Sequence, residues 1–300
     1  MQISDASTAT RISLNRVLRE ATARLREAGI QSAELEAVWL LERALHLTSL
    51  GFIVDRDRIL HPKECAAAEA LINRRVTREP LQYILGTQEF CGLEFEVDSR
   101  VLIPRPESEL LVQQAVQSLD LDLAVTIADI GTGSGCLAVS LAKALPAATI
   151  YALDLSEPAL QVARWNVGRH TLEDRIVCLR GDLFMPLGHL GLMGKVDIIV
   201  SNPPYVTEAE WSQLQPEVRA FEPRSALHGG QDGTHVHRRL LEEAWRYLTP
   251  GGLLLMELGW HQSATVYDLA VGAGRYETPT LCFDEAGIAR VLRVRTLDRS

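Results

Sequence analysis

The chain has 300 residues, of which 47% are hydrophobic and 23% are charged, and its formal net charge is −9. This length and composition are those of a globular protein with room for one large or two moderate domains. The negative net charge disfavours a protein that binds nucleic acid through a broad basic surface, although the protein can still have a local basic patch.

Hydropathy and cysteine usage narrow the class of protein further. No apolar run approaches the roughly 20 residues of a membrane helix, and the segment from Met1 to Asp5 lacks the basic and apolar parts of a signal peptide. The five cysteines are scattered, odd in number and form no C-x-x-C pair. This usage fits reduced thiols and argues against a disulfide framework or a zinc site. We expect a cytoplasmic protein with no membrane association and no metal centre.

Residues 1–82 are predicted to form a helical domain. Apolar residues keep helical spacing from Leu14 to Ala28, with Gly29 as a stop, and a second helix is predicted after Ser32. A third helix is predicted from Pro62 to about Arg78. The domain is either a stabilising cap or a docking module for a partner, and the sequence favours neither. The residues predicted to face inward from the second helix are Leu35, Val38, Trp39 and Leu45.

Residues 83–104 are predicted to link the two domains through a β-hairpin, because apolar residues alternate on both sides of Cys91-Gly92. Residues 105–300 then form the second domain, with a first helix over 107–117. Arg105 lies between two prolines and therefore has a well-defined backbone. Its guanidinium either anchors a partner's carboxylate or pairs with a nearby acidic side chain.

From about Leu123, short apolar runs alternate with helical patterns, which is typical of a parallel sheet covered by helices. The predicted strands are 125–128, 149–153, 176–179, 196–200 and 253–258, with two more near 277–282 and 289–296. The predicted helices are 136–144, 158–167 and 238–248, the last closed by Thr249-Pro250-Gly251-Gly252. The fold class is therefore α/β.

A glycine-rich turn lies between the first predicted strand and its helix. It reads Gly131-Thr132-Gly133-Ser134-Gly135 and is preceded by Asp129-Ile130. Glycines at such a turn let the backbone bend tightly and approach a ligand closely. The spacing G-x-G-x-G differs from the dinucleotide fingerprint G-x-G-x-x-G, which disfavours an NAD-linked oxidoreductase.

Two further aspartates, Asp154 and Asp182, end the second and third predicted strands. A carboxylate at the first position can accept both hydroxyls of a ribose, and one at the second can accept from an adenine amino group. Each aspartate alone could equally be a helix cap or a turn residue. Acidic residues at three successive strand ends, without the spacing for a pyrophosphate, favour S-adenosylmethionine over NAD.

The most informative motif is Asn202-Pro203-Pro204-Tyr205, which follows the apolar strand 196–200. The two prolines stiffen the turn at a strand end, where α/β enzymes place their chemistry. The Asn202 side-chain oxygen and the Pro203 carbonyl are two acceptors at a fixed spacing, suited to holding a planar NH2 group. Tyr205 adds a flat face that can stack on an amide or a base. The alternative interpretation is an ordinary loop that ends in asparagine.

Three other segments carry weaker signals. His235 and His237 suggest a metal pair, but no third ligand is near in the sequence, which favours histidines at a helix start. Residues 229–233, rich in glycine, are predicted to be a flexible turn. Residues 221–224 either line the site or form a structured loop.

On these motifs the sequence resembles the class I S-adenosylmethionine-dependent methyltransferases, and within them the HemK/PrmC family of peptide chain release factor glutamine N5-methyltransferases. The resemblance covers nearly the whole chain: the helical N-terminal domain, the hairpin, Ile103 to Glu109, the glycine-rich turn and Asn202 to Tyr205. It implies a Rossmann-like sheet, S-adenosylmethionine as cofactor with S-adenosylhomocysteine as product, and class I release factors as partners. No direct contact with nucleic acid or membrane is expected.

The resemblance also implies a role for each motif residue. Residues 131–135 would wrap the methionine end of the cofactor, Asp154 would bind the ribose, and Asp182 with Leu183 would border the adenine. Asn202 would touch both cofactor and substrate, and residues 202–205 would hold the glutamine of a Gly-Gly-Gln loop. Family members often carry an aromatic residue where this chain has Leu183, so the adenine stacks either weakly or on Phe184.

Several rival functions stay open at the level of sequence. Ribosomal protein L3 glutamine methyltransferases form a sister branch with the same chemistry, although Ile103 to Glu109 resembles the release-factor branch more. N6-adenine nucleic-acid methyltransferases share Asn-Pro-Pro-Tyr and use it on a flipped base. A non-catalytic cofactor-binding regulator is disfavoured by the intact motif.

Overall fold

The structure is a computed structural model that describes residues 12–119 and 124–298. The segment from Met1 to Asp5, in which no signal peptide was expected, lies outside the described residues. The chain divides into two compact units, Met1–Leu85 and Gly86–Ser300. None of the helices in the described part of the chain has the length and apolar character that crossing a membrane requires.

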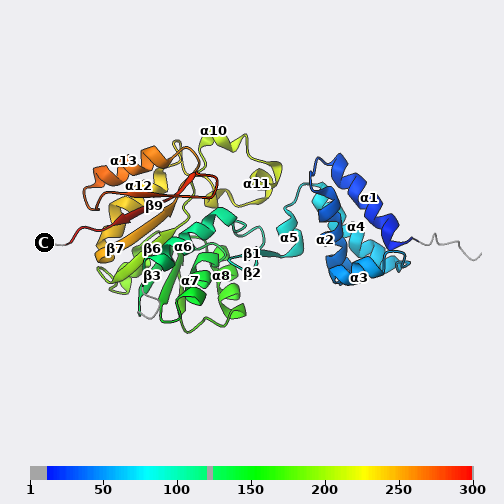
Figure 1. Ribbon diagram of the computed structural model, residues 1–300, viewed down its shortest axis with the longest axis horizontal. Helices are drawn as coiled ribbons and strands as arrows, with labels where there is room; N and C mark the ends of the chain where they lie inside the picture. The colour runs from blue at the N-terminus through cyan, green and yellow to red at the C-terminus, as the bar shows by residue number, and fades with distance from the viewer. Residues whose placement is uncertain (1–11, 120–123, 299–300) are drawn as a thin grey trace, which may run out of the picture. The chain divides into compact units, whose positions relative to one another are not determined.

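The first unit is helical, as predicted, and has its own apolar core. The α4 helix begins with a capping box between His61 and Glu64, and Pro62 occupies its first turn, where the missing N–H costs nothing. Figure 1 shows the unit in blue to cyan. Its helices are α1 (Leu14–Glu27), α2 (Ala33–Leu45), α3 (Ser49–Val54), α4 (Pro62–Val76) and α5 (Leu81–Leu85).

The inward face of α2 differs from the prediction at two positions. Leu35 and Trp39 are 50% and 40% exposed, whereas Glu36 is buried. Glu36 accepts from Arg75 Nε of α4 at 2.5 Å, so an ion pair lets a charged residue turn inward. The buried face of α2 is therefore rotated relative to the face predicted from the apolar residues, and alanines fill the space between the helices. The buried residues of α2 are Ala33, Glu36, Ala37, Leu40, Leu41 and Leu45.

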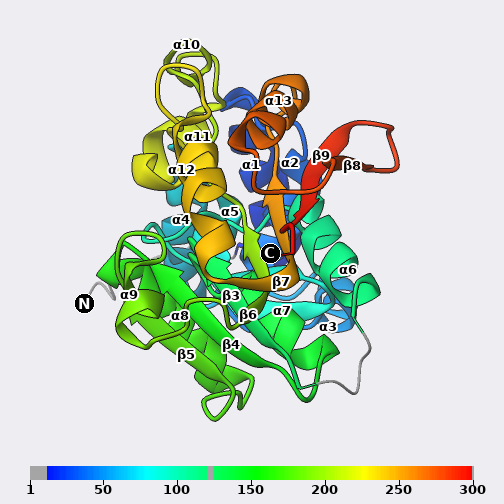
Figure 2. The ribbon, with the colours of Figure 1, turned by 90° about the vertical axis from the view of Figure 1, so that its left-hand side faces the viewer.

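The second unit contains the predicted hairpin and a seven-stranded sheet. The hairpin is antiparallel and turns at Cys91-Gly92, as predicted. The sheet has the order β5-β4-β3-β6-β7-β9-β8, in which the first five strands are parallel and β9 is antiparallel to both of its neighbours, β7 and β8. It can be followed in Figure 2 from green β5 to red β8. The strands are β1 (Thr87–Phe90), β2 (Leu93–Glu96), β3 (Thr126–Ile130), β4 (Thr149–Asp154), β5 (Ile176–Arg180), β6 (Val196–Ser201), β7 (Leu248–Glu257), β8 (Thr280–Phe283) and β9 (Ala289–Arg295).

Helices cover both faces of this sheet, which explains why its central strands are apolar throughout. Side chains alternate between two cores: Ile127 of β3 packs with α6, α7 and α8, and Ala128 packs with α12 and α13. Figure 1 shows these two groups of helices on opposite sides of the strands. The helices, 3-10 turns included, are η1 (Pro106–Ser108), α6 (Glu109–Gln117), α7 (Cys136–Ala144), α8 (Glu157–Arg169), α9 (Met185–His189), α10 (Glu208–Trp211), α11 (Pro216–Phe221), η2 (Arg224–Ala226), α12 (His235–Glu243), η3 (Ala244–Arg246) and α13 (Ser263–Ala273).

The prediction of a helix over 238–248 closed by a Pro-Gly turn was wrong at its end. The helix stops at Glu243, and Thr249 to Gly252 lie within β7. The register passes from Val196↔Leu248 to Ile198↔Leu253, so the four residues bulge out of the ladder while the strand continues. A bulge tolerates proline and glycine in a strand, and this is what the sequence pattern could not distinguish from a turn.

The strand order also fixes where a ligand can bind. The chain runs outward from β3 to β4 and β5 on one side, and β6 and β7 lie on the other side of β3. At such a switch point the loops after neighbouring parallel strands diverge and leave a crevice at their carboxyl ends.

Candidate active site

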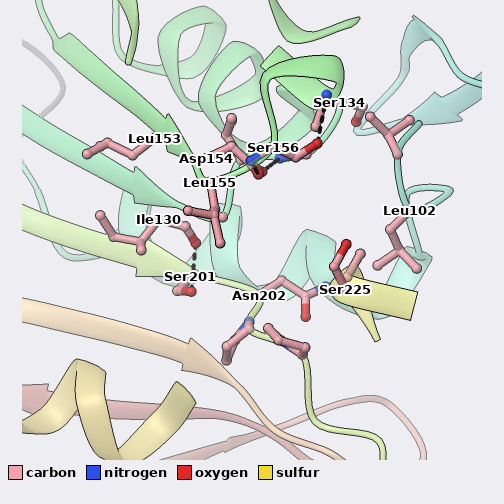
Figure 3. A pocket seen from close by; sticks show the side chains of 18 of the residues that line it. Leu102, Ile130, Ser134, Leu153, Asp154, Leu155, Ser156, Ser201, Asn202 and Ser225 are labelled. Carbon is pink, nitrogen blue, oxygen red and sulfur yellow. Dashed lines mark hydrogen bonds between the residues drawn. The ribbon is translucent and has the colours of Figure 1, made fainter. Parts of the chain in front are cut away.

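A cavity of about 310 Å³ lies at the carboxyl ends of β3, β4 and β6, within the second unit. This volume falls at the lower end of the range of small-molecule sites. Its lining includes the glycine-rich turn, the residues after β4 and β5, the start of Asn202-Pro203-Pro204, and the segment from Arg100 to Ser108. Figure 3 shows Asp154 and Leu155 on one side of this space and Asn202 on another.

The glycine-rich turn is held in a bent conformation that only glycine adopts easily. Gly131 and Gly133 have φ of +77° and +55°, and a Cβ built on either would meet nothing within 4 Å. The backbone N–H groups of Gly131 and Thr132 both donate to the Leu153 carbonyl, at 2.8 and 2.9 Å. The turn is thus tied to the end of β4 and leaves open space beside its backbone.

Gly135 belongs to the same turn but does not line the cavity. Its φ is +81°, and an added Cβ would lie 3.3 Å from Ala163 of α8. The predicted cofactor role of Gly135 stays a prediction, while the structure gives this glycine a packing role between the turn and α8.

Asp154 connects the turn to the next helix. Its Oδ2 accepts from Gly133 N at 2.9 Å and its Oδ1 accepts from Ser156 N at 2.8 Å. Burial raises the pKa of this carboxyl, and the backbone donors act in the opposite direction. The carboxylate has more acceptor positions than these backbone donors occupy, so this cavity-lining side chain can still accept from ligand hydroxyls.

Asp182 lies in a different setting from the one expected. Arg239 of α12 donates to both of its carboxylate oxygens, at 3.0 and 2.8 Å, and this guanidinium lowers the pKa of Asp182. Both residues line the cavity. A carboxylate held in this way is ionised and fixed in place, and any bond from an adenine amine would be added to the arginine pair.

The structure also decides between Leu183 and Phe184. Leu183 lines the cavity and has a left-handed φ of +45°, which is rare and costly for a residue with a branched side chain. Phe184 is fully buried and stacks on Tyr247, with ring centroids 5.0 Å apart. The suggestion that Phe184 supplies adenine stacking is therefore wrong, because its ring belongs to the core.

The end of β6 brings the Asn202 motif beside the glycine-rich turn. Ser201 Oγ donates to the Ile130 carbonyl at 2.7 Å, which ties β6 to β3 where both strands end. Asn202, Pro203 and Pro204 line the cavity, whereas Tyr205 does not. The structure thus brings together every predicted site residue except Gly135 and Tyr205.

Tyr205 is enclosed by backbone from two glycine-containing loops. A Cβ on Gly229 would lie under 3 Å from the Pro204 carbonyl oxygen, and one on Gly259 would lie 3.0 Å from the Tyr205 ring. Gln262 Nε2 donates to the Tyr205 carbonyl at 2.8 Å. The turn at 229–233 was predicted to be flexible, but Gly229 and Gly233 pack closely against the motif.

Sequence reasoning missed two buried residues beside Asn202. Asn202 Nδ2 donates to Ser108 Oγ at 2.9 Å, and Ser108 Oγ donates to Glu257 Oε2 at 2.5 Å. Tyr205 Oη donates to the other carboxylate oxygen at 3.4 Å. Burial raises the pKa of Glu257 to about 7. The sequence signal that could have revealed Glu257 is its position as a carboxylate at the end of the apolar run Leu-Leu-Leu-Met-Glu.

The pairing of Arg105 with a nearby acidic side chain is confirmed. Its guanidinium donates to Glu222, which is buried and also accepts from Ile103 N at 3.1 Å. Pro223 lines the cavity next to this pair. Residues 221–224 are therefore both a structured loop and part of the cavity wall.

The two histidines of the possible metal pair have different surroundings. His235 begins α12, and His237 is buried with its Nε2 2.8 Å from the Glu257 carbonyl oxygen. Burial lowers the pKa of His237. In the described ranges, 12–119 and 124–298, no three side chains are grouped in a way that could hold a metal ion.

The cavity lining and the carboxyl of Asp129 behind it fit S-adenosylmethionine, whose methionine part carries an ammonium and a sulfonium. Asp129 is fully buried behind the turn and accepts from Thr132 Oγ1 at 2.6 Å. Its Oδ1 has no hydrogen-bond partner among the described residues, and burial raises its pKa to about 7. A cationic ligand nearby would favour the ionised carboxylate, and the open side of Gly131 and Gly133 leaves room for it.

Comparison with known proteins agrees with this fold. A solved methyltransferase structure from Pyrococcus furiosus matches with a TM-score of 0.50 and 21% identity, over 77% of this chain and 98% of that one. Residues 16–86 match the family model "PrmC N-terminal domain", and residues 106–217 match the model "Methyltransferase small domain". The sheet order, the glycine-rich turn and the acidic strand end define a class I S-adenosylmethionine-dependent methyltransferase.

Two relatives narrow the family. A release factor glutamine methyltransferase of Geobacter sulfurreducens is 46% identical over 89% of this chain and 91% of its own length. A release factor glutamine methyltransferase of Moorella thermoacetica is 42% identical over 92% of this chain and 96% of its own length. The chain belongs to the release factor glutamine methyltransferase family, as the resemblance in the sequence indicated.

Proposed function

We propose that this protein transfers a methyl group from S-adenosylmethionine to the side-chain amide nitrogen of the glutamine in the Gly-Gly-Gln loop of class I peptide chain release factors. The observation that carries the proposal is the position of Asn202 and Pro203, which line the same cavity as the glycine-rich turn. The names of the relatives, release factor glutamine methyltransferases, support the choice of acceptor.

The chemical difficulty of this reaction lies in the acceptor. An amide nitrogen is a poor nucleophile because its lone pair is delocalised into the carbonyl. S-adenosylmethionine supplies an electrophilic methyl group on a positively charged sulfur. The protein must therefore hold the nitrogen in line with that methyl group, about 3 Å away, in a near-attack geometry.

In this proposal the Asn202 Oδ1 and the Pro203 carbonyl oxygen accept the two N–H groups of the glutamine amide. These bonds orient the nitrogen lone pair and strengthen as positive charge develops on nitrogen. Pro204 follows directly and keeps the two acceptors at a fixed spacing. The stacking role of Tyr205 stays a prediction, since its ring is held behind the cavity lining.

The remaining residues would bind the cofactor. Residues 131–134 would border its methionine end, Asp154 would accept from the ribose hydroxyls, and Asp182 with Leu183 would border the adenine. The role of Asp154 is supported by its place in the cavity lining and by the acceptor capacity that its carboxylate keeps beside the backbone donors.

We assign substrate recognition to the helical domain, residues 1–82, with 83–104 as the linking segment and 105–300 as the catalytic domain. The separate family model that matches residues 16–86 supports a distinct role for the helical part. A glutamine on the loop of a folded protein needs recognition beyond one side chain. A cytoplasmic location is part of the same proposal.

The test is transfer of labelled methyl from S-adenosylmethionine to three acceptors: a bacterial class I release factor, the same factor with its loop glutamine replaced, and ribosomal protein L3. We expect label on the first acceptor only. Label on L3 alone would move the protein to the sister branch. No label on any acceptor would contradict the proposal and direct attention to nucleic-acid substrates.

A further inference from the structure

Three polar side chains from distant parts of the chain form one continuous hydrogen-bonded series, which runs from Asn202 and Ser108 in the cavity lining to Glu257 behind it. Asn202 follows β6, Ser108 ends η1 and Glu257 ends β7. The amide Nδ2 of Asn202 donates to Ser108 Oγ at 2.9 Å, and the hydroxyl of Ser108 donates to Glu257 Oε2 at 2.5 Å. Ser108 is 3% exposed and Glu257 is 2% exposed, so bulk water has little access to this series.

Which side chain donates and which accepts in these hydrogen bonds follows from the number of protons that each can donate. A serine hydroxyl has a single proton to donate, and an ionised carboxylate can only accept. With Glu257 ionised, the Ser108 proton is committed to the carboxylate. Ser108 Oγ can then only accept from Asn202, which it does through Nδ2.

This direction fixes which end of the Asn202 amide faces a substrate. An asparagine side chain carries NH2 on one side and oxygen on the other. Since one N–H of Nδ2 is held by Ser108, the amide plane is fixed, and Oδ1 is the acceptor that Asn202 offers in the cavity it lines. Rotation of the amide by 180° would present an NH2 group instead, and two NH2 groups cannot hydrogen-bond to each other.

We propose that Ser108 and Glu257 are positioning residues that hold Asn202 in the one orientation in which Oδ1 accepts an N–H from the acceptor, and that this selects a primary amide over a carboxylate. The inference rests on the proposed function, because it concerns the acceptor glutamine. A glutamate side chain, with no N–H to donate, would meet Oδ1 as an unfavourable acceptor–acceptor contact.

The charges around Glu257 come from each element that packs against it. Glu107 of η1 repels the carboxylate and Arg290 of β9 attracts it, while the Tyr205 hydroxyl donates to it. His237 of α12 faces the backbone carbonyl of Glu257, with Nε2 2.8 Å from the oxygen. Burial is the largest influence and raises the pKa of the carboxyl to about 7.

Protonation of Glu257 would remove the fixed direction of the hydrogen bonds that connect Asn202, Ser108 and Glu257. A protonated carboxyl can donate to Ser108, whose own proton is then free to bond with Oδ1 of Asn202. The amide loses its preferred orientation, so kcat should rise with pH through about 7 and level off above it. This pH dependence is a readout that a merely structural role would not produce.

The experiment uses the full chain and labelled methyl transfer to a class I release factor, with four variants. Ser108→Ala should lower kcat about 10- to 100-fold, the range expected when a transition-state hydrogen bond is weakened, with KM for S-adenosylmethionine within about twofold of wild type. Ser108→Thr keeps the hydroxyl and should restore kcat to within about threefold. Glu257→Gln should lower kcat and flatten its rise near pH 7.

The matched control is Ser140→Ala. This substitution removes another buried serine hydroxyl, which belongs to α7 and lies away from the cavity, and it should leave kcat unchanged.

Two results would overturn this inference without affecting the proposed function. In the first, the wild-type protein labels the release factor and Ser108→Ala has the same kcat. In the second, the pH profile of Glu257→Gln is identical to that of wild type. A lower unfolding temperature in Ser108→Ala with unchanged kcat would likewise show a structural role only. Failure of the wild-type protein to label the release factor overturns the proposed function itself. The wild-type reaction therefore separates the two failures.

Discussion

At the scale of single residues, the proposed chemistry depends on how Asn202 is held. Its side chain lines the cavity, and its Nδ2 is fixed by Ser108 at 2.9 Å. An acceptor oxygen preorganised in this way needs no reorientation as charge develops on the substrate nitrogen, which is why such groups contribute strongly to catalysis.

Asn202→Ala should lower the rate of methyl transfer about 100-fold or more, because it removes an acceptor that acts in the transition state. The affinity for S-adenosylmethionine should change little, since the turn and Asp154 remain. Single-turnover transfer to a release factor and calorimetric titration with the cofactor would measure the two effects. A rate within about threefold of wild type, which is less than 1 kcal/mol on the barrier, would contradict the proposed role.

The buried carboxyl of Glu257 should also affect stability. Burial raises its pKa in the folded state from 4.5 to about 7, so ionisation costs more in the folded than in the unfolded protein. This group therefore lowers the free energy of unfolding progressively as pH rises from about 4.5 to about 7, and the full cost is present above that range. Relative to wild type, Glu257→Gln should gain stability across this window, by about 3 kcal/mol at most. Urea unfolding at pH 5 and pH 8 would measure the difference, and an equal effect at both values would be inconsistent with it.

At the scale of elements, the glycine-rich turn performs two separate tasks. Gly131 lines the cavity and has open space around it, while Gly135 lies against Ala163 of α8. Asn166 of the same helix is fully buried and donates to the Ser134 carbonyl at 2.8 Å. The turn is thus shaped by α8 on one side and is available to a ligand on the other.

Gly135→Ala and Gly131→Ala should therefore fail in different ways. Both force an alanine into a left-handed conformation, at about 1–2 kcal/mol, and only Gly135→Ala adds a close contact with α8, at about 1–3 kcal/mol more. We expect the larger loss of thermal stability in Gly135→Ala and the larger loss of cofactor affinity in Gly131→Ala. Calorimetry of unfolding and of binding would separate them, and the reverse order would refute the division of tasks.

At the scale of the whole molecule, the chain consists of two units, each with its own apolar core. The cavity is lined entirely by residues of the second unit. Cofactor binding and recognition of a protein substrate can therefore depend on different parts of the chain.

A fragment of residues 86–300 should bind S-adenosylmethionine with an affinity within about threefold of the full chain, because every lining residue is present. Methylation of a release factor should fall about tenfold or more, since the proposed recognition domain is missing. Titration with the cofactor and labelled transfer would be compared between the fragment and the full protein. Equal loss of both activities would identify the helical unit as a structural cap.

The sequence alone determined the alternation of strands and helices, the hairpin and the motifs at strand ends. These are local features: the helix 136–144 and the turn at Cys91-Gly92 follow from spacing and residue type within a few positions. The same holds for Asn202 to Pro204 and the glycine-rich turn, whose place after a strand predicted that they would meet at one edge of the sheet.

Only the tertiary structure decided which side chains those motifs meet. Glu36 turns inward because Arg75, 39 positions away, pairs with it. Ser108 and Glu257 are 149 positions apart and meet because η1 and the end of β7 lie side by side behind Asn202. A buried polar group is tolerated only where its partner is present, and the partner is set by the packing of distant elements. Local periodicity contains no information about such pairs, and this is why the positioning of Asn202 could be seen only in the folded chain.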